Sequence, residues 1–122
     1  MHTIDIRKHP TALHLKSASS MLWENHIAVG GEIGNYIAEE ISRLGQEKYV
    51  FSRLSDPLAA NCIFVNNVLI RRHVSEFPRC VEGFRALDQT VKNMGGTVIE
   101  VDASELSKVD GALSCCCILL NI

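Results

Sequence analysis

The side chains of this sequence best suited to covalent chemistry are its cysteines. Five occur in 122 residues, and three of them are consecutive, at positions 115–117. A disulfide framework is not expected, because the number is odd and neighbouring residues of an extended chain point to opposite faces. Zinc is weakly supported, because no Cys-x-x-Cys or His-x-x-x-His pair is present. We therefore expect reduced thiols, one of which could act as a nucleophile once ionised.

A thiol nucleophile needs a partner that moves protons, and imidazole titrates close to neutral pH. His14 lies in a segment of alternating apolar and polar residues, and the four other histidines are expected at the surface: His2, His9, His26 and His73. By residue type alone, a histidine on a strand is more often structural.

The cysteines could instead have a structural role, because a free cysteine often packs in a core as a small hydrophobic residue. On an extended strand Cys115 and Cys117 would share one face and Cys116 would take the other. Cys62 fits core packing better than a redox-sensitive role.

The elements that must position these residues form a repeated strand–strand–helix–strand unit of α/β class. In both units apolar residues alternate in the strands and recur at helical spacing in the helix. The first unit, residues 12–53, has expected strands at 13–18, 25–29 and 48–52 and a helix at 32–44. The second, residues 59–101, has strands at 61–65, 68–71 and 97–101 and a helix that begins near residue 75 and ends at Gly95. A helical turn at 104–107 and a closing strand at 112–121, the start of a third unit, complete the chain.

The composition is that of one soluble globular domain, with 47% hydrophobic and 21% charged residues. No linker separates the units, so we expect residues 1–122 to form a single, incomplete domain. The net charge is −2, and no basic run exceeds two residues, so neither nucleic acid nor an anionic membrane is an expected partner. The longest apolar run, 115–120, is far shorter than the ~20 residues of a membrane span. With no apolar signal-peptide core near Met1, we expect a cytoplasmic protein.

Three motifs together resemble the dimethylarginine dimethylaminohydrolases, or dimethylargininases, of the pentein superfamily. They are LHLKS at 13–17, AANCI at 59–63 and KVDGALSCC at 108–116, and the resemblance extends from about residue 12 to residue 121. It corresponds to the C-terminal half of those enzymes. It implies a pentein-type α/β propeller, of which this chain would supply about two ββαβ modules and the first strand of a third.

The resemblance also implies an activity. A hydrolase of this kind acts in arginine metabolism and nitric oxide regulation, and it converts N-methylated arginine to citrulline and methylamine or dimethylamine without a cofactor. Cys115 would be the nucleophile, His14 the general acid and base, and Val109 and Asp110 would line the substrate pocket. No metal would be required, and Zn²⁺ would bind Cys115 and His14 as an inhibitor.

Two alternatives stay open. The resemblance implies that the carboxylates and the arginine that grip the substrate lie in the other half of the longer family members. The chain could then be a fragment or isoform that serves as a folding or association module and self-associates through exposed strand edges. The other alternative is a related pentein chemistry, that of the arginine deiminases or the amidinotransferases.

Overall fold

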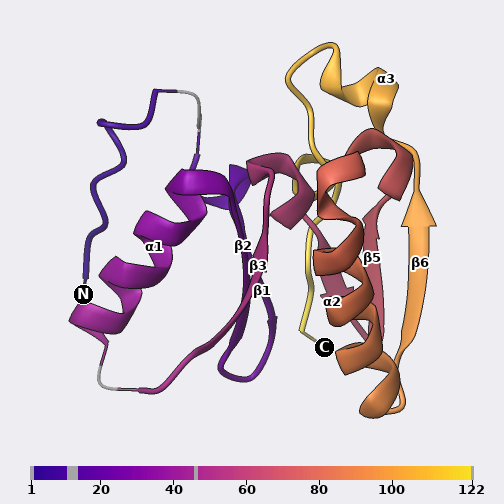
Figure 1. Ribbon diagram of the computed structural model, residues 1–122, viewed down its shortest axis with the longest axis horizontal. Coiled ribbons are helices and arrows are strands. Elements are labelled where there is room, and N and C mark those ends of the chain that lie inside the picture. Colours follow the sequence, from indigo (N-terminus) through magenta and orange to yellow (C-terminus); the bar gives the residue numbers. More distant parts are fainter. Residues whose placement is uncertain (1, 11–13, 46, 122) are drawn as a thin grey trace.

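Two units with the same element order follow each other along the chain (Figure 1). The computed structural model describes residues 2–10, 14–45 and 47–121. The first unit contains strands β1 (Ser19–Trp23) and β2 (His26–Gly30), helix α1 (Gly31–Leu44) and strand β3 (Val50–Leu54). The second contains strands β4 (Ile63–Val65) and β5 (Val68–Arg72), helix α2 (Val81–Asn93) and strand β6 (Thr97–Val101). The two expected ββαβ modules are therefore confirmed.

Both modules build their sheet in the same way. The middle strand pairs antiparallel with the strand before it and parallel with the strand after the helix, in the orders β1-β2-β3 and β4-β5-β6. Asn25 in the first hairpin and Asn66 and Asn67 in the second have positive φ angles. Asparagine tolerates this left-handed conformation better than most residues, which explains its place in both turns.

The first strand begins later than the sequence predicted. The expected strand covered residues 13–18; Leu13 lies outside the described residues, and Leu15–Ser17 forms a short 3-10 helix, η1. The Ser17 amide donates to the His14 carbonyl at 2.9 Å, and the Ser19 hydroxyl donates to the Leu15 carbonyl at 2.8 Å. Local hydrogen bonds of this kind compete with sheet pairing. His14 therefore stands at the start of a helical turn and not on a strand.

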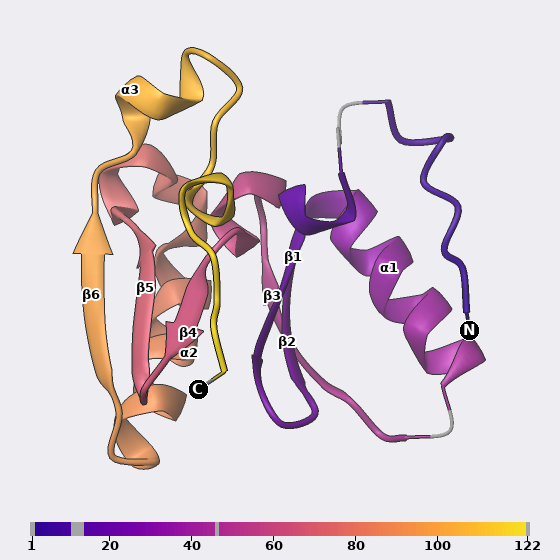
Figure 2. The ribbon, with the colours of Figure 1, turned by 180° about the vertical axis from the view of Figure 1, so that it is seen from behind.

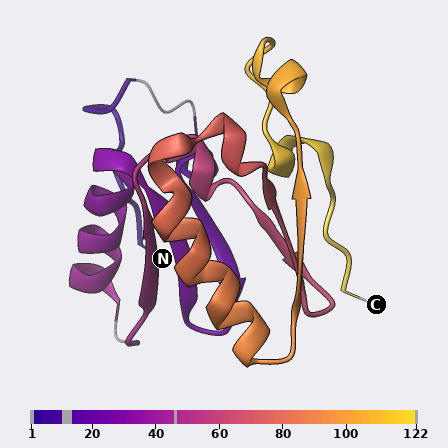
Figure 3. The ribbon, with the colours of Figure 1, turned by 45° about the vertical axis from the view of Figure 1, so that its right-hand side comes forward.

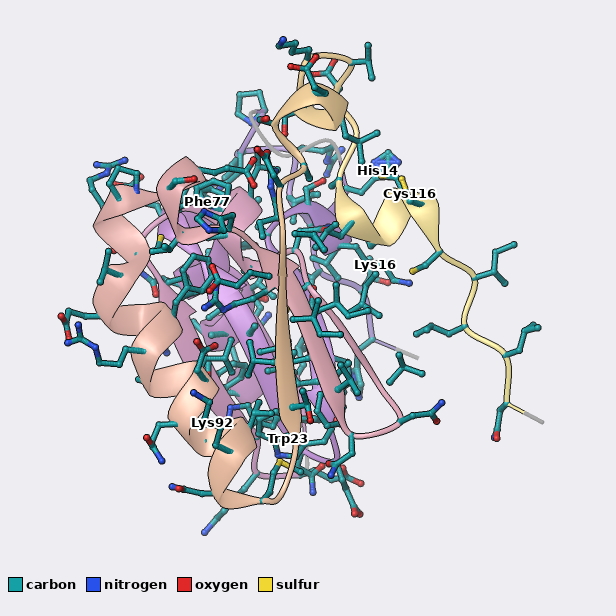
Figure 4. All side chains as sticks on the ribbon, turned by 90° about the vertical axis from the view of Figure 1, so that its right-hand side faces the viewer. His14, Lys16, Trp23, Phe77, Lys92 and Cys116 are labelled. Carbon is teal, nitrogen blue, oxygen red and sulfur yellow. The ribbon has the colours of Figure 1, made fainter. Side chains whose placement is uncertain are left out.

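A second prediction is also wrong, because the expected closing strand at residues 112–121 does not form. Leu113–Cys116 forms the 3-10 helix η5, closed by the Cys115 amide donating to the Ala112 carbonyl at 3.0 Å. Residues 117–121 continue without regular structure. Figures 3 and 4 show them outside the second sheet, on the side opposite α2. The period-2 alternation expected for the cysteines therefore does not apply.

The helix α2 packs in a core that both modules share. Its buried residues Phe84, Leu87 and Val91 belong to one cluster with Leu69 of β5 and with Leu54 at the end of β3. Gly83 permits the close approach to the first module, because a Cβ there would lie 2.6 Å from the Leu54 Cδ2 atom. Each fully buried apolar side chain of this size contributes about 1.5–3 kcal/mol.

The only adjacent arginines of the sequence do not form a surface patch. Arg71 and Arg72 are both buried. Arg71 forms a two-pronged ion pair with Asp88 of α2, at 2.8 and 2.7 Å. Arg72 bonds Glu76 and the Ser107 hydroxyl, and thereby ties β5 to the short helix α3 (Ser104–Ser107). In the part of the chain that the structure describes, no helix has the length and apolar character that crossing a membrane requires.

One histidine that was expected at the surface is buried. His26 begins β2, its ring lies 4.2 Å from the ring of Trp23, and its Nε2 lies 2.8 Å from the Ser52 hydroxyl of β3. Because β2 is the middle strand of its sheet, every residue in it is buried. Burial disfavours the charged imidazolium and lowers the pKa of His26 below its usual value of 6.5.

We expect this burial to make stability depend on pH. Above about pH 7 His26 is neutral in both states, and its contribution to folding is complete. As the pH falls below 6.5, the unfolded chain takes up the proton more readily than the folded chain, so the free energy of unfolding should fall. Urea unfolding between about pH 7.5 and pH 5.5 measures this. The dependence of the unfolding free energy on pH should become weaker in His26→Gln. It should persist in His2→Gln, which alters an exposed histidine. An unchanged pH dependence in His26→Gln would show that His26 is not its source.

Candidate functional site

A cavity of about 910 Å³ opens where three short 3-10 helices meet. These are η1, η5 and η2 (Pro57–Ala60), which gather at one end of the two sheets (Figure 2). This is the end at which the parallel strands β2 and β3 finish, the common position for ligand sites in α/β sheets. The volume suits a small organic molecule.

The structure brings both predicted catalytic residues to this cavity. His14 lines it from the start of η1, and Cys115 lines it from η5. Both side chains are exposed, as a pair that must meet a substrate requires. In the view of Figure 4, the His14 side chain appears at the same end of the molecule as η5. Cys117 is half-buried, and its thiol donates weakly to the Ser114 carbonyl.

Of the two residues predicted to line the substrate pocket, only one lies at this cavity. Asp110 lines the cavity together with Gly111 and Ala112, at a turn in which Asp110 has φ of 58°. The Gly111 amide donates to the Leu106 carbonyl at 2.9 Å, which fixes this turn against α3. Val109 is not among the residues that line the cavity, and its side chain is 76% exposed.

One buried amide lies between the two catalytic candidates. Asn61 follows η2, lines the cavity and is 1% exposed. Its Nδ2 atom donates to the main-chain carbonyl of Lys16 and to the hydroxyl of Ser114, both at 2.7 Å. Its Oδ1 atom accepts a hydrogen bond from the Ser114 main-chain amide at 3.0 Å. Both polar atoms of the Asn61 side chain therefore form hydrogen bonds, with Lys16 in η1 and with Ser114 in η5.

Two carboxylates and one ammonium group set the charge of the cavity, together with His14. Asp56 lines it at the start of η2, where its Oδ1 atom accepts from the Leu58 amide at 3.0 Å. Asp110 and Lys16 line it as well. Sequence analysis anticipated only Asp110. The sequence does contain a signal for Asp56: an aspartate before a proline and a short apolar run is a typical helix cap.

Cys116 is exposed but does not line the cavity, and the two buried thiols are unsuited to nucleophilic chemistry. Burial raises the pKa of Cys62 to about 12, so this thiol is not ionised at neutral pH. Cys80 is buried in the same core. Within residues 2–10, 14–45 and 47–121, no three His, Cys, Asp or Glu side chains are grouped closely enough to hold a metal ion; Cys115 and His14 would supply two ligands.

Comparison with known proteins bears on this site. No family model matches the chain. It is 31% identical over 105 residues to the N(G),N(G)-dimethylarginine dimethylaminohydrolase of Pseudomonas aeruginosa, a match that covers 84% of this chain and 35% of the relative. The chain thus spans about a third of the length of that relative. The predicted resemblance to this family, as a partial one, is confirmed.

Solved structures give the same result. A dimethylarginine dimethylaminohydrolase bound as an adduct to 4-chloro-2-hydroxymethylpyridine is 29% identical, with a TM-score of 0.58 over 85% of this chain and 36% of that one. A cysteine-to-serine mutant of the Pseudomonas aeruginosa enzyme, complexed with citrulline, is 27% identical, with a TM-score of 0.56 over 84% and 35%. A cyanobacterial arginine dihydrolase shares the fold, with 21% identity and a TM-score of 0.55 over 90% and 17%. The fold class, a partial pentein-type α/β propeller, is confirmed.

Proposed function

We propose that this chain, which resembles part of a dimethylarginine dimethylaminohydrolase, carries the nucleophile and the proton-transfer group for hydrolysis of N-methylated arginine. The observation that carries the proposal is that His14 and Cys115, from opposite ends of the sequence, line one cavity. Support also comes from the relative named for this activity and from a related structure complexed with citrulline.

The chemistry follows from the two side chains. The Cys115 thiolate attacks the guanidinium carbon, and a C–S bond forms. His14 then gives a proton to the methylated nitrogen, and the C–N bond breaks as methylamine or dimethylamine leaves. Next, His14 takes a proton from water, whose oxygen attacks the same carbon. The C–S bond breaks, and citrulline and the thiolate are released.

Two carboxylates against the ammonium group of Lys16 leave a net negative charge on the described cavity lining, which favours a cationic substrate. Sequence analysis anticipated a cavity without a guanidinium clamp, and burying a cation without an opposing anion is unfavourable by several kcal/mol. Asp56 and Asp110 place two carboxylates on the cavity wall. We assign Asp110, and not Val109, to substrate binding. Zn²⁺, with only Cys115 and His14 as ligands, would compete with the substrate and act as an inhibitor.

Replacing the nucleophile should separate Cys115 from its neighbour. Cys115→Ser should abolish citrulline release from dimethylarginine, because a serine hydroxyl is a far weaker nucleophile than a thiolate. Cys117→Ser is the matched control and should retain most of the activity, because Cys117 does not line the cavity. Equal losses in both variants would contradict the assignment. No citrulline from the unmutated chain would mean that it does not carry the reaction on its own.

His14→Ala should impair turnover more than binding. A positioned proton-transfer group contributes about 10²–10⁴-fold to a rate, so kcat should fall by that order while KM changes little. His73→Ala alters an exposed histidine away from the cavity and is the control. Steady-state citrulline assays decide the matter, and an unchanged kcat would show that His14 is structural.

A second candidate function is favoured by a different observation. Ile118, Leu119 and Leu120 follow η5 and are 86%, 64% and 78% exposed. A run of three exposed apolar residues is typical of a surface that another chain covers. We therefore propose, as the second candidate, that the chain is an association module in which this run packs against a second copy.

Light scattering tests this candidate. The chain should show a mass above its own 13.5 kDa or form aggregates, and Leu120→Asp should shift the population toward the monomer, because a charge disfavours burial. Met94→Asp changes another exposed apolar residue, on the turn after α2, and should have little effect. A stable monomer of the unmutated chain would rule the candidate out.

A further inference from the structure

The two segments that carry His14 and Cys115 meet through one side chain. Among the described residues, Asn61 provides all the hydrogen bonds that link residues 14–18 to residues 107–117. Lys16, its partner on the first segment, stands two residues after His14. Ser114, its partner on the second, directly precedes Cys115. The relative position of the two catalytic candidates therefore depends on a single buried amide.

The chemistry of the bonds explains why this position holds an asparagine. The amide nitrogen donates to an oxygen on each segment, and the amide oxygen accepts from the main chain of one of them. A carboxylate would place an oxygen against the Lys16 carbonyl, and an apolar side chain would leave that carbonyl and the Ser114 amide without a partner. Both hydrogen bonds are part-buried, and a bond of this kind contributes about 0.5–1.5 kcal/mol.

We propose that Asn61 is a positioning residue that holds His14 and Cys115 in the geometry needed for proton transfer, acting through the main chains of Lys16 and Ser114. This inference rests on the proposed function, since it requires His14 and Cys115 to work as a pair. Neither η1 nor η5 contains a buried residue. Only the residues beside them are buried, Ala18 after η1 and Ala112 before η5, so loss of the amide should let His14 and Cys115 shift relative to each other.

The experiment measures how strongly His14 influences Cys115, without requiring turnover. The chain is treated with iodoacetamide across a range of pH, and alkylation of the Cys115 peptide is followed by mass spectrometry. Iodoacetamide alkylates the thiolate, and an imidazole within reach of the thiol can accept its proton, so His14→Ala should slow alkylation of Cys115 about tenfold near neutral pH. The same substitution is then made in an Asn61→Ala chain, where its effect should fall to about twofold or less.

Matched variants separate positioning from stability. Ser114→Ala removes one hydroxyl but keeps the bonds from the Lys16 carbonyl and the Ser114 amide, so most of the His14 effect should remain. Cys62→Ala alters the next residue, which is also buried and whose side chain bonds neither segment. It should leave the effect intact. Asn61→Asp, of nearly the same size, should lose the effect as Asn61→Ala does, and it decides the test if the alanine variant does not fold.

Each outcome has a distinct meaning. A tenfold effect of His14→Ala that persists in both Asn61 variants would overturn the positioning role and leave the proposed function standing. If the effect of His14→Ala on Cys115 is lost in a Cys62→Ala chain as fully as in an Asn61→Ala chain, Asn61 matters only for stability, and the inference is overturned. If His14→Ala leaves alkylation of Cys115 unchanged in the otherwise native chain, the inference is overturned, and the proposed function is decided separately by the citrulline assays of the Cys115 and His14 variants.

Discussion

A three-stranded sheet with one helix has two faces, and the helix can cover only one of them. In the first module, Ile27 and Val29 of β2 pack against α1, whereas Ala28 between them faces the core that contains α2. The first sheet is thus enclosed between its own helix and the helix of the next module. Neither module buries its apolar surface alone, and this requirement fixes how the two are placed.

The shared core aligns the ends of the strands, and the cavity forms there. The segments around it contribute little to the core and depend on hydrogen bonds instead. Ser107 bonds Arg72 of β5, which anchors α3 ahead of the turn that carries Asp110. Asn61 bonds η1 and η5 directly. A rigid double module therefore supports a rim of short helices held by polar contacts, an arrangement common in sites built on loops.

Periodicity predicted the modules because it reports burial, and α1 and strands β2, β4, β5 and β6 lie close to the expected ranges. Helix α2 begins at Val81 and not near residue 75, because Pro78 disfavours a helical backbone at Phe77 and the residues before α2 form two short 3-10 helices. Periodicity failed at the rim, where hydrogen bonds and not burial decide the conformation. Alternation at 13–18 and 112–121 predicted strands. The hydrogen-bond partners that favour 3-10 helices there are distant in sequence, as Asn61 is from Ser114. His26 was misplaced for a related reason, since only pairing on both sides reveals that β2 is the middle strand. The motifs carry tertiary context that periodicity lacks, and three of the residues that they singled out, His14, Asp110 and Cys115, line one cavity.

The two candidate functions are physically linked. His14 and Cys115 are exposed, and water around them weakens every electrostatic interaction with a bound cation. The apolar run of Ile118, Leu119 and Leu120 begins three residues after Cys115, so a chain that packed against this run would also lie beside η5. Contact that extended from this run to Cys115 would exclude water there and strengthen the attraction between the cavity carboxylates and a guanidinium. Association at this surface would therefore favour the chemistry and would not compete with it.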